Sequence, residues 1–404
     1  MNGSTTPETV AAVDATSWPT LHLFEICHEI SKGTTPLSYG HPYTTYGVPF
    51  LAAEDLGLKG VDTASVGRHV SPECHEFLRR SKLRPNDVLI SIAGTLGRVS
   101  FLHETAGPVN CNQAVCFIRL DLARAHRDFV VYALRSNAIQ NRLRGQGIGG
   151  GVTNLNLPMI RDFEIPLLPL AEQERIAGRL TEQLATVERA QEAAQSRLAA
   201  AESPPAAYLR EVFEGPEASR DFITLRDCAS IHPGQHILEN AYNRKGDGIG
   251  YLTGPADFGL TVPEICRWTN KPKAWAIPGD VLITVKGAGV GKANLAPPSK
   301  VAIGRQLMAI RPGTDLDQQL LFLFVRHSFA AFQAAGIGAT VPGLGREDVE
   351  RLVLPLHSLP DQRRIAADLS ARLAGADHLA VGIRAELAAI EALPAALLRE
   401  AFCQ

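Results

Sequence analysis

The chain has 404 residues, of which 45% are hydrophobic and 20% charged, and its formal net charge is −2 at pH 7. This composition excludes a disordered chain and provides material for two or three globular units. The apolar runs are much shorter than the roughly 20 residues of a membrane span, and the first 20 residues lack the basic start and apolar run of a signal peptide. We therefore expect a cytoplasmic protein.

The small net charge hides two basic regions. Residues 79–144 hold eleven Lys and Arg against four Asp and Glu, and residues 244–311 hold ten against four. Phosphate neutralisation needs Lys and Arg, so the overall charge argues against nucleic-acid binding while its distribution favours it.

Several short sequences occur twice in the same order. Asp87-Val-Leu-Ile90 returns as Asp280-Val-Leu-Ile283, and Tyr208-Leu-Arg-Glu-Val-Phe213 returns as Leu397-Leu-Arg-Glu-Ala-Phe402. The phrase PLLPLAEQERIA at 166–177 returns as PLHSLPDQRRIA at 355–366, 189 positions later. Repetition in a fixed order predicts a duplicated module.

Each module has two unlike parts. The first part is rich in Gly and Pro with short β-branched runs, such as residues 87–92 and 280–285, and helical patterns at 128–144 and 318–335. This mixture predicts an α+β globular region with a strand-rich centre. We expect a flexible N-terminus at 1–17, globular regions at 18–165 and 216–354, and long helices at 166–215 and 355–404.

The long helices carry apolar residues at alternating spacings of three and four, which is a heptad seam. Equal seams predict that the two helices pack against each other, and Pro205 and Pro394 predict a break before a short terminal helix that ends at Phe213 or Phe402. The seam residues are Ala177, Leu180, Leu184, Val187, Gln191, Ala194, Leu198 and Ala201, then Ala366, Leu369, Leu373, Ala376, Ala380, Ile383, Leu387 and Ile390.

No catalytic motif is complete. Residues 286–293, KGAGVGKA, lack the first glycine and the final Ser or Thr of a phosphate-binding loop. We interpret them, and residues 94–98, as glycine turns between strands with a cation at the tip. The proline pairs do not form the Asn/Asp-Pro-Pro-aromatic tetrad of amino methyltransferases, GxSxG is missing, and the histidines lack metal-ligand spacing. The seven scattered cysteines, without a CxxC pair, favour buried free thiols.

Taken together, these landmarks resemble the specificity subunit of type I restriction-modification systems. The resemblance spans nearly the whole chain and is sharpest in the phrase at 166–177 and 355–366, followed each time by a long helix and the Leu-Arg-Glu-x-Phe ending. It implies a non-catalytic subunit in defence against foreign DNA. Two target recognition domains would each read one half of a bipartite DNA site, separated by two helices packed as an antiparallel coiled coil with a pseudo-twofold internal repeat.

The resemblance also implies partners and cofactors. Two modification (methyltransferase) subunits would dock on the helices and bind S-adenosylmethionine, and a restriction subunit, if present, would use ATP and magnesium. The chain itself would bind no cofactor and no metal. A coiled-coil scaffold whose globular regions bind protein and not DNA stays open as an alternative, as does an enzyme with an unrecognised site.

Candidate DNA contacts are basic residues for phosphates and polar residues on loops for bases. A solvated surface charge explains any one of them equally well. The first region offers Arg79, Arg80, Lys82, Arg98 and Arg119, with Gln146, Thr153 and Asn154 of the glycine-rich loop 145–154; the second offers Arg244, Lys245, Lys271, Lys273, Lys286, Lys292 and Arg305. For helix–helix packing the main candidates are Leu180, Leu184, Val187, Leu198, Leu369, Leu373, Ile383 and Leu387.

Overall fold

The computed structural model describes residues 18–145, 155–166, 168–215, 221–287, 289–335 and 343–402. The chain divides into two compact units, which we call unit 1 (Met1–Ala193 with Leu387–Gln404) and unit 2 (Ala194–Glu386). Within the described ranges, no helix has the length and apolar character needed to cross a bilayer.

Unit 1 is built around two small sheets. One is antiparallel in the order β2 (Cys27–Lys32), β9 (Val115–Leu120), β6 (Val88–Ser91), β7 (Val99–Phe101). The other has the order β4 (His69–Val70), β3 (Val48–Leu51), β8 (Val109–Cys111), β5 (Lys82–Leu83), with β3 and β8 parallel. A separate ribbon pairs β1 (Thr20–His22) with β10 (Glu164–Pro166).

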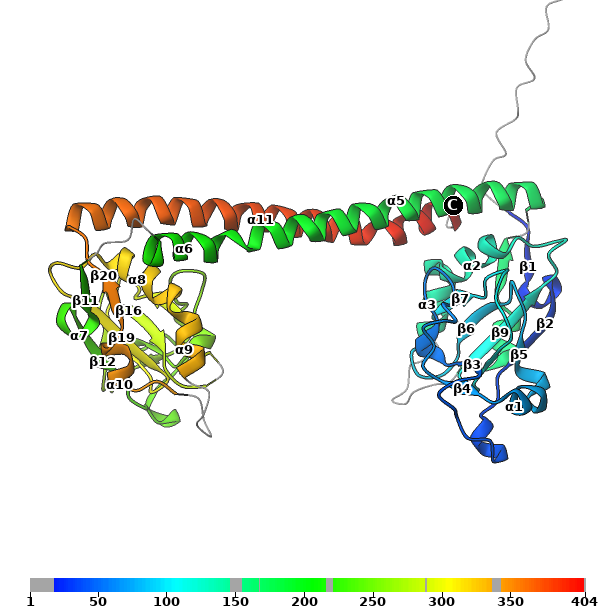
Figure 1. Cartoon of the computed structure of the whole chain (residues 1–404), viewed down its shortest axis with the longest axis horizontal. Helices are drawn as coiled ribbons and strands as arrows, with labels where there is room; N and C mark the ends of the chain where they lie inside the picture. The colour runs from blue at the N-terminus through cyan, green and yellow to red at the C-terminus, as the bar shows by residue number, and fades with distance from the viewer. Residues whose placement is uncertain are drawn as a thin grey trace, which may run out of the picture. The chain divides into compact units, whose positions relative to one another are not determined.

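The run Asp-Val-Leu-Ile forms a strand that is buried on both faces. Val88 and Ile90 of β6 pack in a cluster with Phe129 of helix α2 (Arg127–Arg135), whereas Leu89 packs with Leu51 and other residues of the second sheet. A continuous apolar run suits a strand covered on both sides. Figure 1 shows α2 and α3 (Asn137–Gly145) beside β6 and β7; α4 (Leu157–Arg161) follows them in the chain.

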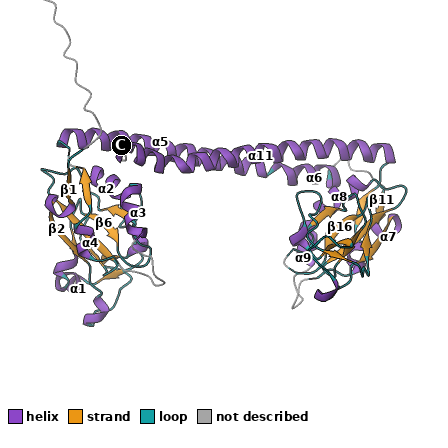
Figure 2. Ribbon diagram, turned by 180° about the vertical axis from the view of Figure 1, so that it is seen from behind, coloured by secondary structure: helices purple, strands orange, loops and turns teal. Residues whose placement is uncertain are grey.

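Unit 2 repeats this framework strand for strand. Its sheets have the orders β12 (Ala229–Pro233), β19 (Leu307–Pro312), β16 (Val281–Thr284), β17 (Ala293–Leu295), and β14 (Trp268–Thr269), β13 (Ile249–Leu252), β18 (Val301–Ile303), β15 (Trp275–Ala276). Strands β11 (Phe222–Thr224) and β20 (Val353–Pro355) form the ribbon. The helices are α7 (Leu225–Cys228), α8 (Gln318–His327), α9 (Phe329–Ala335) and α10 (Arg346–Glu350), and Figure 2 shows α8 beside β16.

The repeated phrase begins the two long helices, α5 (Leu170–Glu202) and α11 (Leu359–Phe402). Buried Gln173 donates to the carbonyls of Arg124 and Leu168 at 3.0 and 2.8 Å and accepts from the His126 amide at 2.8 Å. Buried Gln362 makes the same three bonds with Asp315, His357 and Asp317. The glutamine thus fastens each helix start to the loop before α2 or α8, which explains why the phrase occurs twice.

All sixteen seam positions are buried or partly buried. In unit 1, Ala177 and Leu180 pack with Leu398 and Ala401 of α11 in the cluster that also contains the sheet and α2. In unit 2, Leu369 and Leu373 pack with Leu209 and Phe213 of α6 (Pro204–Glu214) in the corresponding cluster. The seam therefore joins helix to helix and, at these positions, helix to globular core.

The two helices run antiparallel within unit 2. Leu198 and Ala201 pack with Ala380 and Ile383. Arg197 and Glu202 of α5 form ion pairs with Glu386, at 3.0 Å, and Arg384 of α11. Glu211 of α6 pairs with Arg372 of α11 at 2.8 Å, so residue numbers rise along one helix as they fall along the other. Exposed pairs of this kind contribute about 0–1 kcal/mol each, so the apolar seam provides most of the stabilisation.

The predicted break at the prolines occurs in one copy only. Helix α5 ends at Glu202 and α6 begins at Pro204, whereas α11 continues through Pro394 to Phe402, so the expectation for the second copy was wrong. Two consecutive prolines, 204 and 205, remove two backbone donors and fit best in a first helical turn. A single proline removes one hydrogen bond, and buried Leu398 and Ala401 hold the continuation against the core of unit 1.

Candidate nucleic-acid interface

A buried ion pair recurs at the same place in both units. Arg119 on β9 donates from Nε and Nη2 to the two carboxylate oxygens of Asp87 at 3.0 and 2.9 Å, and also pairs with Glu29. Arg311 on β19 binds Asp280 in the same way, at 2.8 and 2.9 Å. The hydrogen bond to Asp280 raises the pKa of the Arg311 guanidinium.

Because of this pair, Arg119, which was predicted to bind phosphate, has a structural role. Its side chain is only 14% exposed, and its charge is met by two carboxylates. The sequence already indicates this ion pair. In both modules the aspartate before the Val-Leu-Ile run is followed, 32 or 31 residues later, by an arginine near the end of another apolar run. Both arginines belong to the framework that supports the surface.

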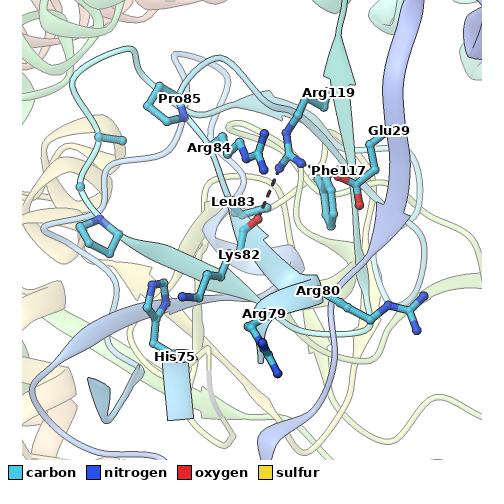
Figure 3. Close-up of a pocket in the computed structure, with 13 residues that line it drawn as sticks. Glu29, His75, Arg79, Arg80, Lys82, Leu83, Arg84, Pro85, Phe117 and Arg119 are labelled. Atoms are coloured by element: carbon cyan, nitrogen blue, oxygen red, sulfur yellow. Dashed lines mark hydrogen bonds and ion pairs between the residues drawn. The ribbon is translucent and has the colours of Figure 1, made fainter. Parts of the chain in front are cut away.

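Unit 1 has a basic hollow of about 450 Å³ beside this pair (Figure 3). Figure 3 shows Lys82 extending toward His75, whereas Arg79 and Arg80 point away from them. The sequence prediction did not include two of the basic lining residues, Arg84 and His75, although Arg84 lies in the same basic run. The titratable lining residues are Glu29, His75, Arg79, Arg80, Lys82, Arg84 and Arg119.

The charges in the hollow differ in how they are compensated. Lys82 pairs with Glu76 at 2.5 Å, and this hydrogen bond lowers the pKa of Glu76. Arg79, Arg80 and Arg84, in contrast, form no ion pair with any residue that the structure describes. Three exposed guanidinium groups without a described ion-pair partner favour an anionic ligand, because guanidinium groups bind phosphate oxygens well.

The two glycine turns place a cation at equivalent positions. In unit 1 the Ser91 amide donates to the Arg98 carbonyl at 2.9 Å, and in unit 2 the Thr284 amide donates to the Lys292 carbonyl at 2.8 Å. Gly97 and Gly291, just before these cations, have φ of 75° and 86°, which a glycine adopts most readily. The turns join β6 to β7 and β16 to β17, so the interpretation as strand-to-strand turns is confirmed, and a phosphate-binding loop, which leads into a helix, is excluded.

In unit 2 the predicted basic residues fall into three groups on neighbouring loops. Lys286 and Arg305 lie on loops joined by a bond from the Val285 amide to the Gln306 carbonyl at 2.8 Å. Lys271 and Lys273 lie between β14 and β15, and Arg244 and Lys245 precede β13. All six, like Lys292, are exposed, and no described acid pairs with any of the seven.

Two basic positions of the hollow carry other residues in unit 2. Ile277 occupies the position that Arg84 has in unit 1. The Ile277 amide donates to Asp280 at 2.9 Å, as the Arg84 amide donates to Asp87 at 2.7 Å. Trp275 stands at the first position of β15, as Lys82 does in β5, and Lys300 lies over its ring at 3.9 Å. The same framework therefore carries two chemically different surfaces.

The remaining predicted residues divide between exposed and undescribed positions. Arg98 is exposed and donates to the carbonyl of Glu54 at 3.3 Å. Gln146, Thr153 and Asn154 lie outside the described residues. Within the ranges given above, no group of three His, Cys, Asp or Glu side chains is arranged to hold a metal. The six cysteines that the structure describes are free. Three are buried, Cys27 and Cys228 are half-buried and Cys266 is exposed, so the expectation of buried thiols was wrong for Cys266.

Comparison with known proteins agrees with this framework. Residues 16–195 match the type I restriction modification DNA specificity domain. The putative type I restriction enzyme MjaX specificity subunit of Methanocaldococcus jannaschii is 24% identical over 381 residues, covering 88% of this chain and 86% of that protein. The type I restriction enzyme EcoBI specificity subunit of Escherichia coli is 27% identical over 194 residues, covering 47% of this chain and 40% of that protein.

Two solved structures share the fold of the whole chain. One comes from work on complex assembly and conformational transition of the type I R-M system, with a TM-score of 0.81, 24% identity, and coverage of 96% of this chain and 98% of that one. The other is the HsdS subunit from Thermoanaerobacter tengcongensis, with a TM-score of 0.66, 24% identity, and coverage of 96% and 97%.

The match to the type I restriction modification DNA specificity domain thus falls almost entirely in unit 1. The resemblance to specificity subunits of type I restriction-modification systems, predicted from the repeated phrase, is confirmed along most of the chain. The chain is thus similar over most of its length to a protein described as a type I specificity subunit.

Proposed function

We propose that the chain recognises a bipartite DNA sequence on behalf of a type I restriction-modification complex, unit 1 reading one half and unit 2 the other. The observation that carries this proposal is the duplicated framework with unlike surfaces. The Asp87–Arg119 pair has its equivalent in the Asp280–Arg311 pair. In contrast, where Lys82 lines the hollow of unit 1, unit 2 has Trp275 with Lys300 over its ring. A shared scaffold with different surface chemistry suits two readers of different sequences.

Phosphate contacts would come from the uncompensated cations. These are Arg79, Arg80, Arg84 and Arg98 in unit 1, and Arg244, Lys245, Lys271, Lys273, Lys286, Lys292 and Arg305 in unit 2. Lys82 would contribute after exchange of its partner Glu76, whereas Arg119 would support the surface from below. Gln146, Thr153 and Asn154 remain proposed base contacts.

Catalysis would belong to partners. We place two modification subunits along α5 and α11, where the repeated helix sequences offer two similar docking surfaces, and a restriction subunit beyond them in a complete system. The modification subunits would bring S-adenosylmethionine, and the restriction subunit ATP and magnesium. The assembly would act in the cytoplasm, where it meets entering DNA.

A domain exchange tests the bipartite reading. Residues 18–165 are replaced by the corresponding region of a type I specificity subunit with a different known target, and the methylated sites are mapped in cells that also produce the modification subunits. We expect one half of the target to change and the other half to stay. The reciprocal exchange of residues 221–354 is the matched control and should change the other half. A change of both halves by one exchange would contradict the proposal, and an assembled complex without salt-dependent DNA binding would favour a protein-binding scaffold.

A further inference from the structure

We propose that an aromatic and cationic surface of unit 1 presses against the base stack of the half-site that unit 1 reads, and distorts it. The surface consists of Tyr39, His41, Phe77, Arg79 and Arg80 and is called the ring–arginine surface below. The rings would contact bases, and the arginines the phosphates of flanking nucleotides. This inference rests on the proposed function and specifies how one of the two units contacts DNA.

Three rings gather on the outside of unit 1. Tyr39 is 57% exposed and Phe77 53%, although both have large apolar surfaces. Their ring centroids are 5.5 Å apart, and that of His41 is 4.8 Å from Phe77. Tyr39 belongs to the 3-10 helix η2 (Pro36–Tyr39) and Phe77 to α1 (Pro72–Phe77), so two separate segments build the cluster. An exposed cluster of apolar rings is typical of a binding surface.

Two arginines without a described ion-pair partner follow the rings directly. Arg79 and Arg80 begin the 3-10 helix η4 (Arg79–Ser81), two and three residues after Phe77, and neither has an ion-pair partner among the described residues. Both also line the basic hollow, as does Arg84. A DNA strand is the partner that offers flat apolar faces and regularly spaced anions together.

The segment between the rings and the arginines is firmly held. Leu78 is buried with Phe50, Val70 and Cys74, and its carbonyl accepts a hydrogen bond from the side chain of buried Asn110 at 3.2 Å. The Ser81 amide donates to the same carbonyl at 3.0 Å. A rigid backbone with outward side chains suits insertion, because little conformational entropy is lost on binding.

Unit 2 has no helix in the described stretch between β14 and β15, where unit 1 has α1 and η4, the elements that carry Phe77, Arg79 and Arg80. The chain between β4 and β5 covers residues 71–81 and contains α1 and η4, whereas the chain between β14 and β15 covers only residues 270–274. This shorter segment carries Lys271 and Lys273 but no ring. The distortion is therefore expected in one half-site and not in the other.

The test uses the assembled complex with its modification subunits, on duplexes of the mapped target with thymines placed in and beside each half. Permanganate attacks thymines that have lost their stacking. Because methyltransferases extrude their target base, some thymines are expected to react in both halves. We expect additional reactive thymines at the half read by unit 1 only, and Phe77→Ala and Tyr39→Ala should remove these additional ones. Phe24→Ala is the matched control, since Phe24 is 48% exposed and stacks on a histidine, His22, at 5.7 Å, but lies in a hollow with Leu157 and Arg161.

Arg79→Ala and Arg80→Ala test the cationic part. Each should lower the slope of log affinity against log salt by about one for the whole target, without changing the preferred sequence. Equivalent sets of reactive thymines in the two halves of the wild-type complex, or unchanged reactivity in Phe77→Ala, would overturn the inference while leaving the proposed function intact. Loss of subunit assembly in Phe77→Ala, with DNA contacts retained, would assign the rings to a protein partner and also overturn it. A wild-type complex that fails to bind the target would instead refute the proposed function.

Discussion

Arg119 Nε and Nη2 donate to Asp87 Oδ1 and Oδ2 at 3.0 and 2.9 Å, and these bonds join β9 to the start of β6 in the centre of unit 1. Asp87 is 1% exposed. The pair closes one side of the basic hollow, so that the surface next to it is supported by a buried interaction that the sequence repeats in unit 2.

Removal of this pair is expected to destabilise unit 1. Arg119→Ala leaves a buried carboxylate without its partner, and breaking a buried pair in this way costs about 3–5 kcal/mol. The free energy of unfolding, measured with urea, reports the loss. Arg79→Ala is the control, because Arg79 is exposed and unpaired, and it should leave the stability of unit 1 unchanged. Reduced DNA affinity of Arg119→Ala at unchanged stability would show that Arg119 contacts DNA after all.

The glutamine of the repeated phrase is expected to fix the start of each long helix. Gln173→Ala removes three hydrogen bonds at a buried position and leaves the His126 amide unpaired, which should cost about 1–3 kcal/mol. Hydrogen exchange should show faster exchange in the first turns of α5. Gln183→Ala, on the exposed face of the same helix, is the matched control. Equal protection in both variants would show that the three bonds are dispensable.

The effect of a seam substitution on folding is expected to depend on which residues the seam residue contacts. Leu180→Glu places a charge in the core that α5 shares with the sheet, so it should unfold unit 1 together with its helix. Ile383→Glu falls where only Leu198, Ala201 and Ala380 share the cluster, so it should separate the helices of unit 2 and spare its sheets. Circular dichroism and proteolysis distinguish the two results. Native-like sheets in Leu180→Glu would mean that the helix contributes little to that core.

The cations of the two glycine turns are expected to act equally in DNA binding. Arg98 and Lys292 occupy equivalent positions after Gly97 and Gly291, so Arg98→Ala and Lys292→Ala should each reduce the salt slope of binding by about one. Affinity at several salt concentrations measures this. Lys59→Ala serves as the control, because Lys59 already pairs with Glu188 at 2.6 Å. A slope change in the control of the same size would mean that the effect reflects overall charge only.

The sequence by itself determined the repeated architecture. Duplicated landmarks, apolar strand runs and the heptad seam are local or periodic signals, and the structure has the two frameworks and paired helices that they predict. The family resemblance depends on the same phrases. The structural role of the repeated phrases could not be predicted from the sequence, because Gln173 and Gln362 bind carbonyl groups that lie up to 49 residues away.

Only the tertiary structure decided which basic residues remain available. Arg79 and Arg119 belong to the same charged region, but folding places one on an exposed 3-10 turn and the other between two carboxylates. Charge compensation depends on side chains brought together from distant strands, and sequence spacing does not specify it. The same holds at Pro394, where the helix continues because residues beyond the proline are buried in unit 1. Local sequence predicts the elements, while long-range packing determines which groups face a ligand.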